Sequence, residues 1–381
     1  MSEVFVVGAG MIPFGRHHSS SYPGLAVPAA LAALAQAGID RTDVETVVAG
    51  HSFGGPLVGQ RIAKELGLGG LPVVNAENAC SGGATAMHLA VAAVSTGRAR
   101  IALVLGVDKL TQFGGGTLPL PAEDWEARRG VVMPAIYAMR ARRYLHEREA
   151  TVEDLAAVAV KARRHGALNP YAQQRTETTV ADVLASRPIA DPLTLFQCCP
   201  TGDGAAAVVV VSADVAAGLA APAVRVAASV LHSGTVARGH RDMTWPEISV
   251  HSARDAYAQA GIGPDDLDVV ELHDAFTIAE LVYYEALGLC ERGGAVELLR
   301  SGDTALGGKT VVNPSGGLLA KGHPVGASGA AQLAEAYWQL TGTAGDRQVP
   351  HARFALTHVT GGGISGLDHG ACAVHILEAA R

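Results

Sequence analysis

Short apolar runs alternate with helical patterns along the first half of the chain. Runs typical of buried strands lie at residues 4–7, 44–50, 73–75, 101–106 and 205–211, and helical periodicity covers residues 24–37 and 81–96. The run at 101–106 contains no polar residue, which is typical of a strand covered on both faces. This alternation predicts an α/β fold in which helices cover a largely parallel sheet.

The same order of elements starts again near residue 222. Strand patterns follow at residues 224–230, 269–272, 354–357 and 371–377, and helical patterns lie at 248–260, 276–287 and from 329 to about 340. No polar or proline-rich linker separates the halves, so we expect a tight interface between them. The sequence therefore predicts two similar domains, residues 1–221 and 222–381.

The middle of the chain interrupts this rhythm. Residues 113–121 are rich in glycine and proline, which predicts a loop. Two charged helical patterns follow, at Met133–Glu147 and Thr151–His165. We interpret residues from about 110 to 170 as a cap inserted into the N-terminal domain.

Composition argues against several classes of function. The net charge of −7 speaks against a nucleic-acid-binding surface. No apolar run reaches the roughly 18 residues that span a bilayer, and the first residues carry no basic leader, so we expect neither a membrane anchor nor export. The five cysteines fit no disulfide framework and no zinc-ligand pattern. We therefore expect a cytoplasmic protein without a metal site.

Cys80 lies in the segment Asn75–Ala84, between a predicted strand and a predicted helix. The free N–H groups and partial positive charge of a helix N-terminus favour a thiolate, so we expect a lowered thiol pKa. The neighbouring glycines let a substrate carbonyl approach the backbone. This is the position of a nucleophile at a strand-to-helix turn, although a small cysteine buried in an alanine-rich core fits the pattern equally well.

His323 lies in the segment Asn313–Gly329, which runs into a predicted helix. Seven of its seventeen residues are glycine or proline, so the backbone follows an unusual and restrained path. An imidazole with a pKa near 6.5 can take up a thiol proton and return it. A surface-loop histidine explains so constrained a setting poorly, and we interpret His323 as an acid–base residue.

A third element, Glu271–Phe276, reads Glu-Leu-His-Asp-Ala-Phe and places His273 at the end of a predicted buried strand. In parallel sheets, ligands bind beyond the carboxyl ends of the strands, so this is a position for a catalytic side chain. Taken alone, the segment fits a helix start better, with Asp274 as the N-cap residue.

Together the three elements resemble the thiolase superfamily, over essentially the whole chain. The resemblance rests most on Gly-His-Pro at residues 322–324 with the Gly-Ala-Ser-Gly that follows, at this distance from Cys80. His-Asp-x-Phe at residues 273–276 and the segment 199–207 are similar to sterol-carrier-protein-type and archaeal-type acetyl-CoA acetyltransferases. The resemblance implies a five-layered αβαβα thiolase fold, a homodimer, and coenzyme A (CoA) as a substrate, without a covalent cofactor or a metal.

The resemblance also implies a role for each residue. Cys80 would carry an acyl group, His323 would activate Cys80 and help to bind a thioester oxygen, and His273 would orient a water molecule or a substrate carbonyl. The N–H of Cys80 and one from Gly361–Gly363 would form the other oxyanion hole, where each donor is typically worth ~3–4 kcal/mol. The expected contacts of CoA are Gly322, Ser315 and Gly362.

The sequence departs from the family at the base that removes a proton from carbon. Most thiolases supply a second cysteine in a C-terminal Cys-x-Gly motif, and sterol-carrier-type enzymes can supply it at the x of His-Asp-x-Phe. Here Ala275 and the segment Thr357–Gly363 occupy those places. His358 is the candidate replacement, with an oxyanion-hole role or strand capping as alternatives, and His369 is a weaker candidate. Three other cysteines are interpreted as core residues: Cys198, Cys199 and Cys372.

We therefore expect an acyltransferase of the thiolase type, which cleaves a 3-oxoacyl-CoA with CoA, or forms it by Claisen condensation, through an acyl-Cys80 intermediate. Alternatives are acyl transfer to a non-CoA carbon nucleophile, retro-aldol cleavage of a 3-hydroxyacyl-CoA, and a lipid-binding or scaffold subunit of the same fold. Because Arg and Lys are sparse around the motifs, we expect a partner to help hold CoA. In the resembling subgroup this partner is a small protein with a zinc ribbon and an OB fold.

Overall fold

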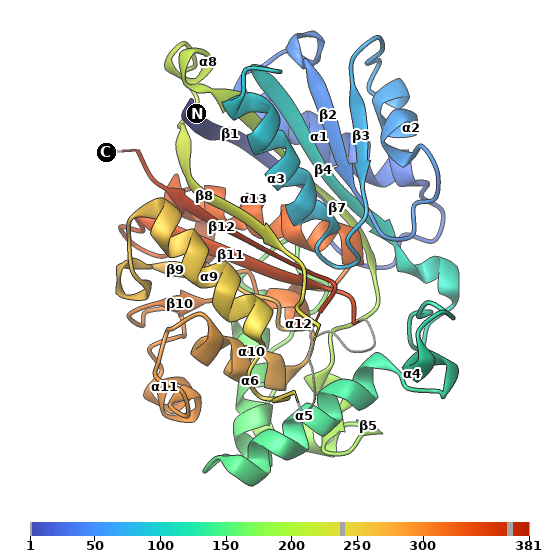
Figure 1. Ribbon diagram of the computed structural model, residues 1–381, viewed down its shortest axis with the longest axis vertical. Helices are drawn as coiled ribbons and strands as arrows, with labels where there is room; N and C mark the ends of the chain where they lie inside the picture. Colours follow the sequence, from blue (N-terminus) through green and yellow to red (C-terminus); the bar gives the residue numbers. More distant parts are fainter. Residues whose placement is uncertain (1, 237–240, 364–368, 381) are drawn as a thin grey trace.

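The computed structural model describes residues 2–236, 241–363 and 369–380, and it confirms the predicted α/β fold (Figure 1). Ten strands form one hydrogen-bonded sheet, in which two sets of five meet where β1 pairs with β8. The first set is β1 (Val4–Met11), β2 (Thr46–Gly50), β3 (Val73–Ala76), β4 (Ile101–Lys109) and β7 (Asp203–Ser212). The second set is β8 (Val224–His232), β9 (Val269–Glu271), β10 (Val311–Val312), β11 (Phe354–Gly361) and β12 (Ala371–Glu378).

The two sets repeat one topology. The strand order is β3-β2-β4-β7-β1 in the first set and β10-β9-β11-β12-β8 in the second. In each set the first three strands in this order are parallel, and the other two pairings are antiparallel. With the antiparallel pairing of β1 and β8, the prediction of a largely parallel sheet is therefore wrong for five of the nine pairings. Burial on both faces removes the alternation of polar and apolar residues that usually marks an antiparallel strand.

Two helices, α3 (Gly82–Ser95) and α13 (Ser328–Leu340), occupy the centre of the fold, and each contacts strands of both sets. The outer face of the first set is covered by α1 (Tyr22–Ala37), with α2 (Val58–Glu65) beside it. The outer face of the second is covered by α9 (Glu247–Ala260), with α10 (Thr277–Ala286) beside it. The layers are thus helix, sheet, helix, sheet and helix, which confirms the predicted αβαβα arrangement.

The central helices meet at their N-termini because glycine stands at the contact. A Cβ atom added to Gly83 would lie 2.6 Å from the carbonyl oxygen of Gly326, and one added to Gly329 would lie 2.5 Å from the Ala84 nitrogen. Only glycine permits so close an approach of two backbones. One helix comes from each half of the chain, so this contact brings together the loops that precede α3 and α13.

The cap connects β4 to β7 and occupies residues 110–202, further along the chain than the expected end near residue 170. Its elements are α4 (Trp125–Arg128), α5 (Met133–Glu147), α6 (Val152–Ala167), α7 (Val180–Ala185), β5 (Pro188–Ala190) and β6 (Leu193–Thr194). A capping box between Thr151 and Asp154 starts α6. This helix packs against α10 and against α12 (Gly317–Lys321) of the second half, so the cap touches both halves.

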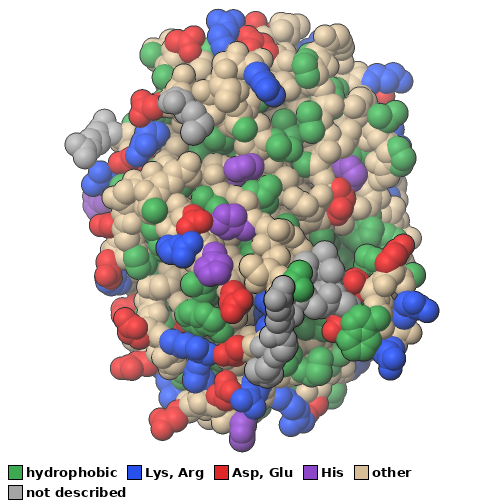
Figure 2. Space-filling model, in the orientation of Figure 1, with side chains coloured by type: hydrophobic (Ala, Val, Ile, Leu, Met, Phe, Trp, Pro, Cys, Tyr) green, Lys and Arg blue, Asp and Glu red, His purple; other side chains and the backbone are tan. Residues whose placement is uncertain are grey.

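Three short helices complete the described α-helices: α8 (Ala213–Ala217), α11 (Ala295–Ser301) and α12 (Gly317–Lys321). The predicted division at residues 221 and 222 falls in the connection between α8 and β8, and it stays a prediction. Acidic and basic side chains are interspersed over the face of the molecule that Figure 2 shows. Among the described helices, none combines the length and apolar character needed to cross a membrane.

Candidate active site

Cys80 lies in the turn between β3 and α3. Ala79, which precedes it, has a φ of 47°, in the left-handed region that costs a non-glycine residue about 1–2 kcal/mol. Glu77 holds the turn by accepting the Ala79 N–H at 2.7 Å, and the Asn78 amide donates to Thr85 Oγ1 at 3.0 Å. This strained turn places the Cys80 thiol just before the N-terminus of α3.

His323 reaches Cys80 from the loop before α13. Its Nε2 is 3.3 Å from Cys80 Sγ, and its Nδ1 is 2.7 Å from Ser328 Oγ. The Ser328 hydroxyl has one hydrogen, which it donates to the carbonyl of Pro324 at 3.1 Å. It therefore accepts a hydrogen bond from Nδ1–H, and the lone pair of Nε2 faces the thiol. This tautomer is ready to take the Cys80 proton.

His273, two residues beyond the end of β9, completes a cluster with Cys80 and His323. One nitrogen of each ring and the Cys80 sulfur all lie within 4.8 Å of one another, and the ring centroids are 5.1 Å apart. Such a cluster is compact enough to ligate a metal, but a thiol beside a base is equally the arrangement of an activated nucleophile. His273 is buried, and within the described residues its Nδ1 has no hydrogen-bond partner. A ring nitrogen in this state can bind a substrate oxygen.

Burial dominates the electrostatics of the pair. It raises the pKa of the Cys80 thiol to about 12, although the N–H groups of Gly362 and of Cys80 itself act in the opposite direction. Burial also lowers the pKa of His323 to about 3. The resting pair is therefore a neutral thiol and a neutral imidazole. The expectation of a lowered thiol pKa is wrong, because desolvation of the thiolate outweighs the favourable N–H groups.

We expect the alkylation of Cys80 by iodoacetamide to accelerate about tenfold per pH unit from pH 6 to pH 9, without a plateau, because only the thiolate reacts. Mass spectrometry of the Cys80 peptide measures this rate. In the urea-unfolded chain the same rate should level off near the ordinary cysteine pKa of about 8.5. A plateau between pH 6 and pH 8 in the folded protein would show a preformed thiolate–imidazolium pair and contradict the expectation.

The end of β11 forms another side of the site. Gly361 packs so closely on the Cys80 turn that a Cβ atom there would lie 2.1 Å from the carbonyl oxygen of Asn78. Gly362 follows with a φ of 60°, and its N–H donates to the Cys80 thiol. The N–H groups of Cys80 and Gly362 thus lie at the reactive sulfur, where negative charge on an attacked carbonyl would develop.

Two buried carboxylates fasten the His323 loop to the strand that carries His273. Glu271 accepts hydrogen bonds from the N–H and the hydroxyl of Ser315, at 3.0 and 2.7 Å, and lies 3.2 Å from Lys321 Nζ. Asp274 accepts the Leu318 N–H at 2.7 Å, at the start of α12. Burial raises the pKa of Asp274 to about 8. The Ser315 hydroxyl, a predicted contact of CoA, donates its hydrogen bond to the buried Glu271 carboxylate.

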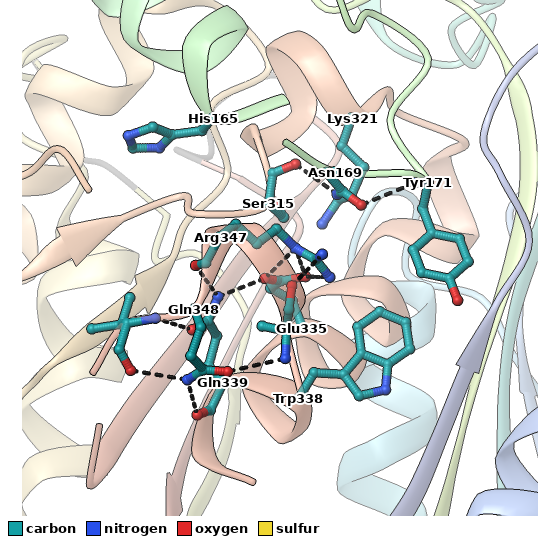
Figure 3. A network of polar contacts seen from close by, with 12 residues as sticks. His165, Asn169, Tyr171, Ser315, Lys321, Glu335, Trp338, Gln339, Arg347 and Gln348 are labelled. Atoms are coloured by element: carbon teal, nitrogen blue, oxygen red, sulfur yellow. Dashed lines mark hydrogen bonds and ion pairs between the residues drawn. The ribbon is translucent and has the colours of Figure 1, made fainter. Parts of the chain in front are cut away.

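The cap holds the same loop from its other side. Asn169, just beyond α6, donates from its amide to the Ser315 carbonyl at 2.8 Å, as Figure 3 shows. His165 Nδ1 lies 2.9 Å from the Asn313 carbonyl. Gly322, the other predicted CoA contact in this loop, has a φ of 109°, which favours glycine. The loop that presents His323 is therefore fixed by both the second sheet and the cap.

His358 lies outside the three-residue cluster. Its Nε2 is 2.9 Å from Ser249 Oγ on α9, and its ring packs against Tyr283 with the centroids 4.4 Å apart. Burial lowers its pKa to about 3. The side chain therefore faces the outer helical layer, which does not favour the predicted role as a base. His369 Nε2 lies 3.5 Å from the Tyr137 hydroxyl.

Sequence reasoning did not single out two residues that position the site. Ser328, which fixes the His323 tautomer, stands inside the Gly-Ala-Ser-Gly segment that carried the resemblance. Asp108 accepts N–H groups from Ser52, Phe53 and Gly326 at 2.7–3.0 Å, and so ties the His323 loop to the first sheet. A lone acidic residue at the end of the apolar run of β4 is the signal that could have identified it.

Comparisons with known proteins agree with this geometry. The family model "Thiolase, N-terminal domain" matches residues 4–214, and "Thiolase C-terminal domain-like" matches residues 229–375. The benzoylsuccinyl-CoA thiolase subunit BbsB of Thauera aromatica is 46% identical over 368 residues, 95% of each chain. The acetyl-CoA acetyltransferase of Methanothermobacter thermautotrophicus is 38% identical over 387 aligned residues, 99% of this chain and 100% of that one.

Among solved structures, the Ltp2-ChsH2(DUF35) aldolase matches with a TM-score of 0.87 at 29% identity, covering 100% of this chain and 98% of that one. The resemblance inferred from the three motifs is thereby confirmed. Thiolases are acyltransferases that use CoA as a substrate and need neither a metal nor a covalent cofactor. This chain belongs to the thiolase family.

Proposed function

We propose that the chain cleaves a 3-oxoacyl-CoA with CoA, and catalyses the reverse Claisen condensation, through an acyl group on Cys80. The observation that carries the proposal is the contact of 3.3 Å between Cys80 Sγ and the unprotonated Nε2 of His323. A nucleophile with a base in reach and N–H donors beside it is what acyl transfer requires.

The first step uses the Cys80–His323 pair. His323 Nε2 takes the thiol proton while the sulfur attacks the C3 ketone, because the pKa values of the two groups do not allow the ion pair to form beforehand. The N–H groups of Cys80 and Gly362 stabilise the resulting oxyanion. Breaking the C2–C3 bond leaves the acyl group on Cys80. His273, beside His323, is placed to bind the thioester oxygen of the departing enolate, and the CoA thiol then takes the acyl group from Cys80.

We propose an aromatic acyl group as the preferred substrate. The 46% identical relative is named for benzoylsuccinyl-CoA, which carries a phenyl ketone. In this chain Tyr137 of the cap stacks on Phe276, with the ring centroids 4.4 Å apart. Phe276 lies three residues after His273. The start of α5 also approaches the residues that follow β11, since Met133 Sδ lies 4.0 Å from where a Cβ of Gly363 would be. We propose that these side chains line the acyl-binding part of the site, where they would suit a flat acyl group.

Intact-mass spectrometry after brief incubation with acetyl-CoA, hexanoyl-CoA and benzoyl-CoA tests the proposal. We expect one acyl adduct per chain, located on Cys80, with benzoyl-CoA reacting at least about tenfold faster than acetyl-CoA, since aromatic contacts of ~1 kcal/mol each favour it. A faster reaction with hexanoyl-CoA would contradict the aromatic preference. An absence of adducts from every acyl-CoA, in native extract as well as with the purified chain, would contradict covalent catalysis.

Retro-aldol cleavage of a 3-hydroxyacyl-CoA is the second candidate, because the matching complex of 29% identity is named an aldolase. That reaction needs a base and an enolate-binding site but no acyl carrier. The paired Cys80 and His323 favour the thiolase reaction, and dependence on Cys80 distinguishes the two.

We propose that the chain forms a homodimer through β3. This strand lies at the edge of its sheet, with Val74 43% exposed, and Leu89 of the adjacent α3 is 37% exposed. An exposed apolar edge strand is a template for pairing with a second chain.

A partner protein is also part of the proposal. The relative from Thauera aromatica is named as a subunit, and the matching aldolase is a complex with a DUF35 protein. We propose that a small zinc-ribbon and OB-fold protein helps this chain to hold CoA. The proposed location is the cytoplasm, because Cys80 must stay reduced and none of the five cysteines forms a disulfide.

A further inference from the structure

Thiolysis needs a group that gives a proton to the departing enolate carbon, and the described residues around Cys80 leave few groups to do so. His323 Nε2 is engaged with the Cys80 thiol. Burial raises the pKa of Asp274 to about 8, but both of its side-chain oxygens face N–H groups of α12. His358 is turned toward Ser249. Ala275 has no ionisable group.

Cys199 stands directly opposite Ala275. Its N–H donates to the Ala275 carbonyl at 2.9 Å, and the preceding Cys198 forms an antiparallel bridge with Phe276. In antiparallel pairing, opposite side chains leave on the same side of the strands, with Cβ atoms about 4.5–5.5 Å apart. The Cys199 thiol therefore lies on the same side as the Ala275 methyl group. It approaches the place that a longer side chain at Ala275 would reach.

The surroundings of Cys199 connect it to the reaction centre. Burial raises the pKa of the Cys199 thiol well above its usual value, and negative charge on Cys198, Cys80 or Asp274 would act in the same direction. The sulfurs of Cys199 and Cys80 thus lie within electrostatic reach of each other. Cys80 and Cys199 both keep part of their surface exposed, so neither residue is sealed in the core.

We propose that Cys199 is the acid–base residue for the carbon atom in the thiolase reaction, an inference that rests on the function proposed above. When the C2–C3 bond breaks, its electron pair passes to C2, and C2 takes the proton of the Cys199 S–H bond. The resulting thiolate then accepts the proton of the incoming CoA thiol, whose sulfur attacks the acyl carbon on Cys80. The cycle restores both thiols without an external acid or base.

Hydrogen exchange at C2 isolates this role. Acetyl-, propionyl- and succinyl-CoA are incubated in D2O with wild type, Cys199→Ala and Cys199→Ser, and deuterium uptake is read by mass spectrometry. Serine nearly conserves the size of the side chain but does not ionise at neutral pH, so both variants are expected to lose exchange by about 100-fold or more. Acylation of Cys80, measured by intact mass on the same samples, should stay within about threefold of wild type. Cys198→Ala is the matched control, because the Cys198 thiol contacts the Thr194 carbonyl at 3.4 Å, and we expect both readouts to stay near wild type.

Each result decides the inference. Lost exchange with retained acylation in both Cys199 variants supports it. Exchange at the wild-type rate in either variant overturns it, and so does a parallel loss of acylation in both, which would indicate a packing role. If wild type itself exchanges C2 hydrogens but never acylates Cys80, the proposed function fails, a result that is separate from the behaviour of Cys199.

Discussion

Replacing Cys80 by alanine is expected to reduce thiolytic cleavage of a 3-oxoacyl-CoA by about 10⁴-fold or more and to abolish the acyl adduct. The Cys80→Ala variant keeps the N–H groups at the site, His323 and the backbone of the turn, so it can bind substrate but cannot form the covalent intermediate. Loss of the thioester absorbance of the 3-oxoacyl-CoA measures cleavage, and intact mass measures acylation.

Cys290→Ala is the control for this experiment, since Cys290 is a free cysteine outside the site and should leave activity within about twofold of wild type. Thermal unfolding of both variants shows whether the fold is retained. Cleavage that survives Cys80→Ala in a folded protein would contradict the thiolase proposal. If a 3-hydroxyacyl-CoA is then the cleaved substrate, the chain is an aldolase.

Replacing Lys321 by methionine is expected to lower the free energy of unfolding by about 3–5 kcal/mol. Lys321 Nζ lies 3.2 Å from Glu271 Oε2, and neither side chain has any exposed surface. Methionine fills much of the same volume but leaves the Glu271 carboxylate buried without its cation. Urea unfolding followed by circular dichroism measures the change, and Lys309→Met is the matched control. The Lys309 pair with Asp265 is solvent-exposed, so its loss should cost less than about 1 kcal/mol.

The loss in free energy of unfolding caused by Lys321→Met should also depend on pH. Burial raises the pKa of Glu271, and Lys321 opposes that shift, so the pKa rises further in the variant. A carboxyl with a higher pKa in the folded than in the unfolded chain binds more protons when folded. Its contribution to stability therefore falls as the pH rises from about 4.3 through the folded pKa. We expect a smaller deficit at pH 6 than at pH 8. An equal deficit at both would show that Glu271 does not titrate.

The sequence predicts the long elements well, because their patterns are set by burial. The apolar runs at 101–106 and 205–211 became β4 and β7, and the alanine-rich patterns became α1 and α3. The short α2, α7 and α11 are not predicted, since helices of six to eight residues depend on packing more than on local propensity. Strand direction is predicted wrongly for the antiparallel strands, because it depends on how the connections return.

At the site, the motifs predict which residues gather but not how the side chains turn. Cys80, His273 and His323 lie together as three motifs from distant parts of the chain suggest. The orientation of His358 could not be predicted, because every residue of β11 is buried and the pattern does not tell one face from the other. The pairing of Cys199 with Ala275 joins segments 76 residues apart and leaves no local signal.

The meeting of α3 and α13 has a consequence for how the chain evolves. The two halves share one strand order, yet the reaction is not duplicated. The half that ends with β7 brings the nucleophile, and the half that begins with β8 brings both imidazoles and the Gly362 N–H. Neither half can catalyse the reaction before the two halves pack together. Selection for catalytic turnover therefore also acts on the interface between α3 and α13. Substitutions at that interface, such as Gly83→Ala, would therefore reduce catalytic activity although the substituted residues do not contact the substrate.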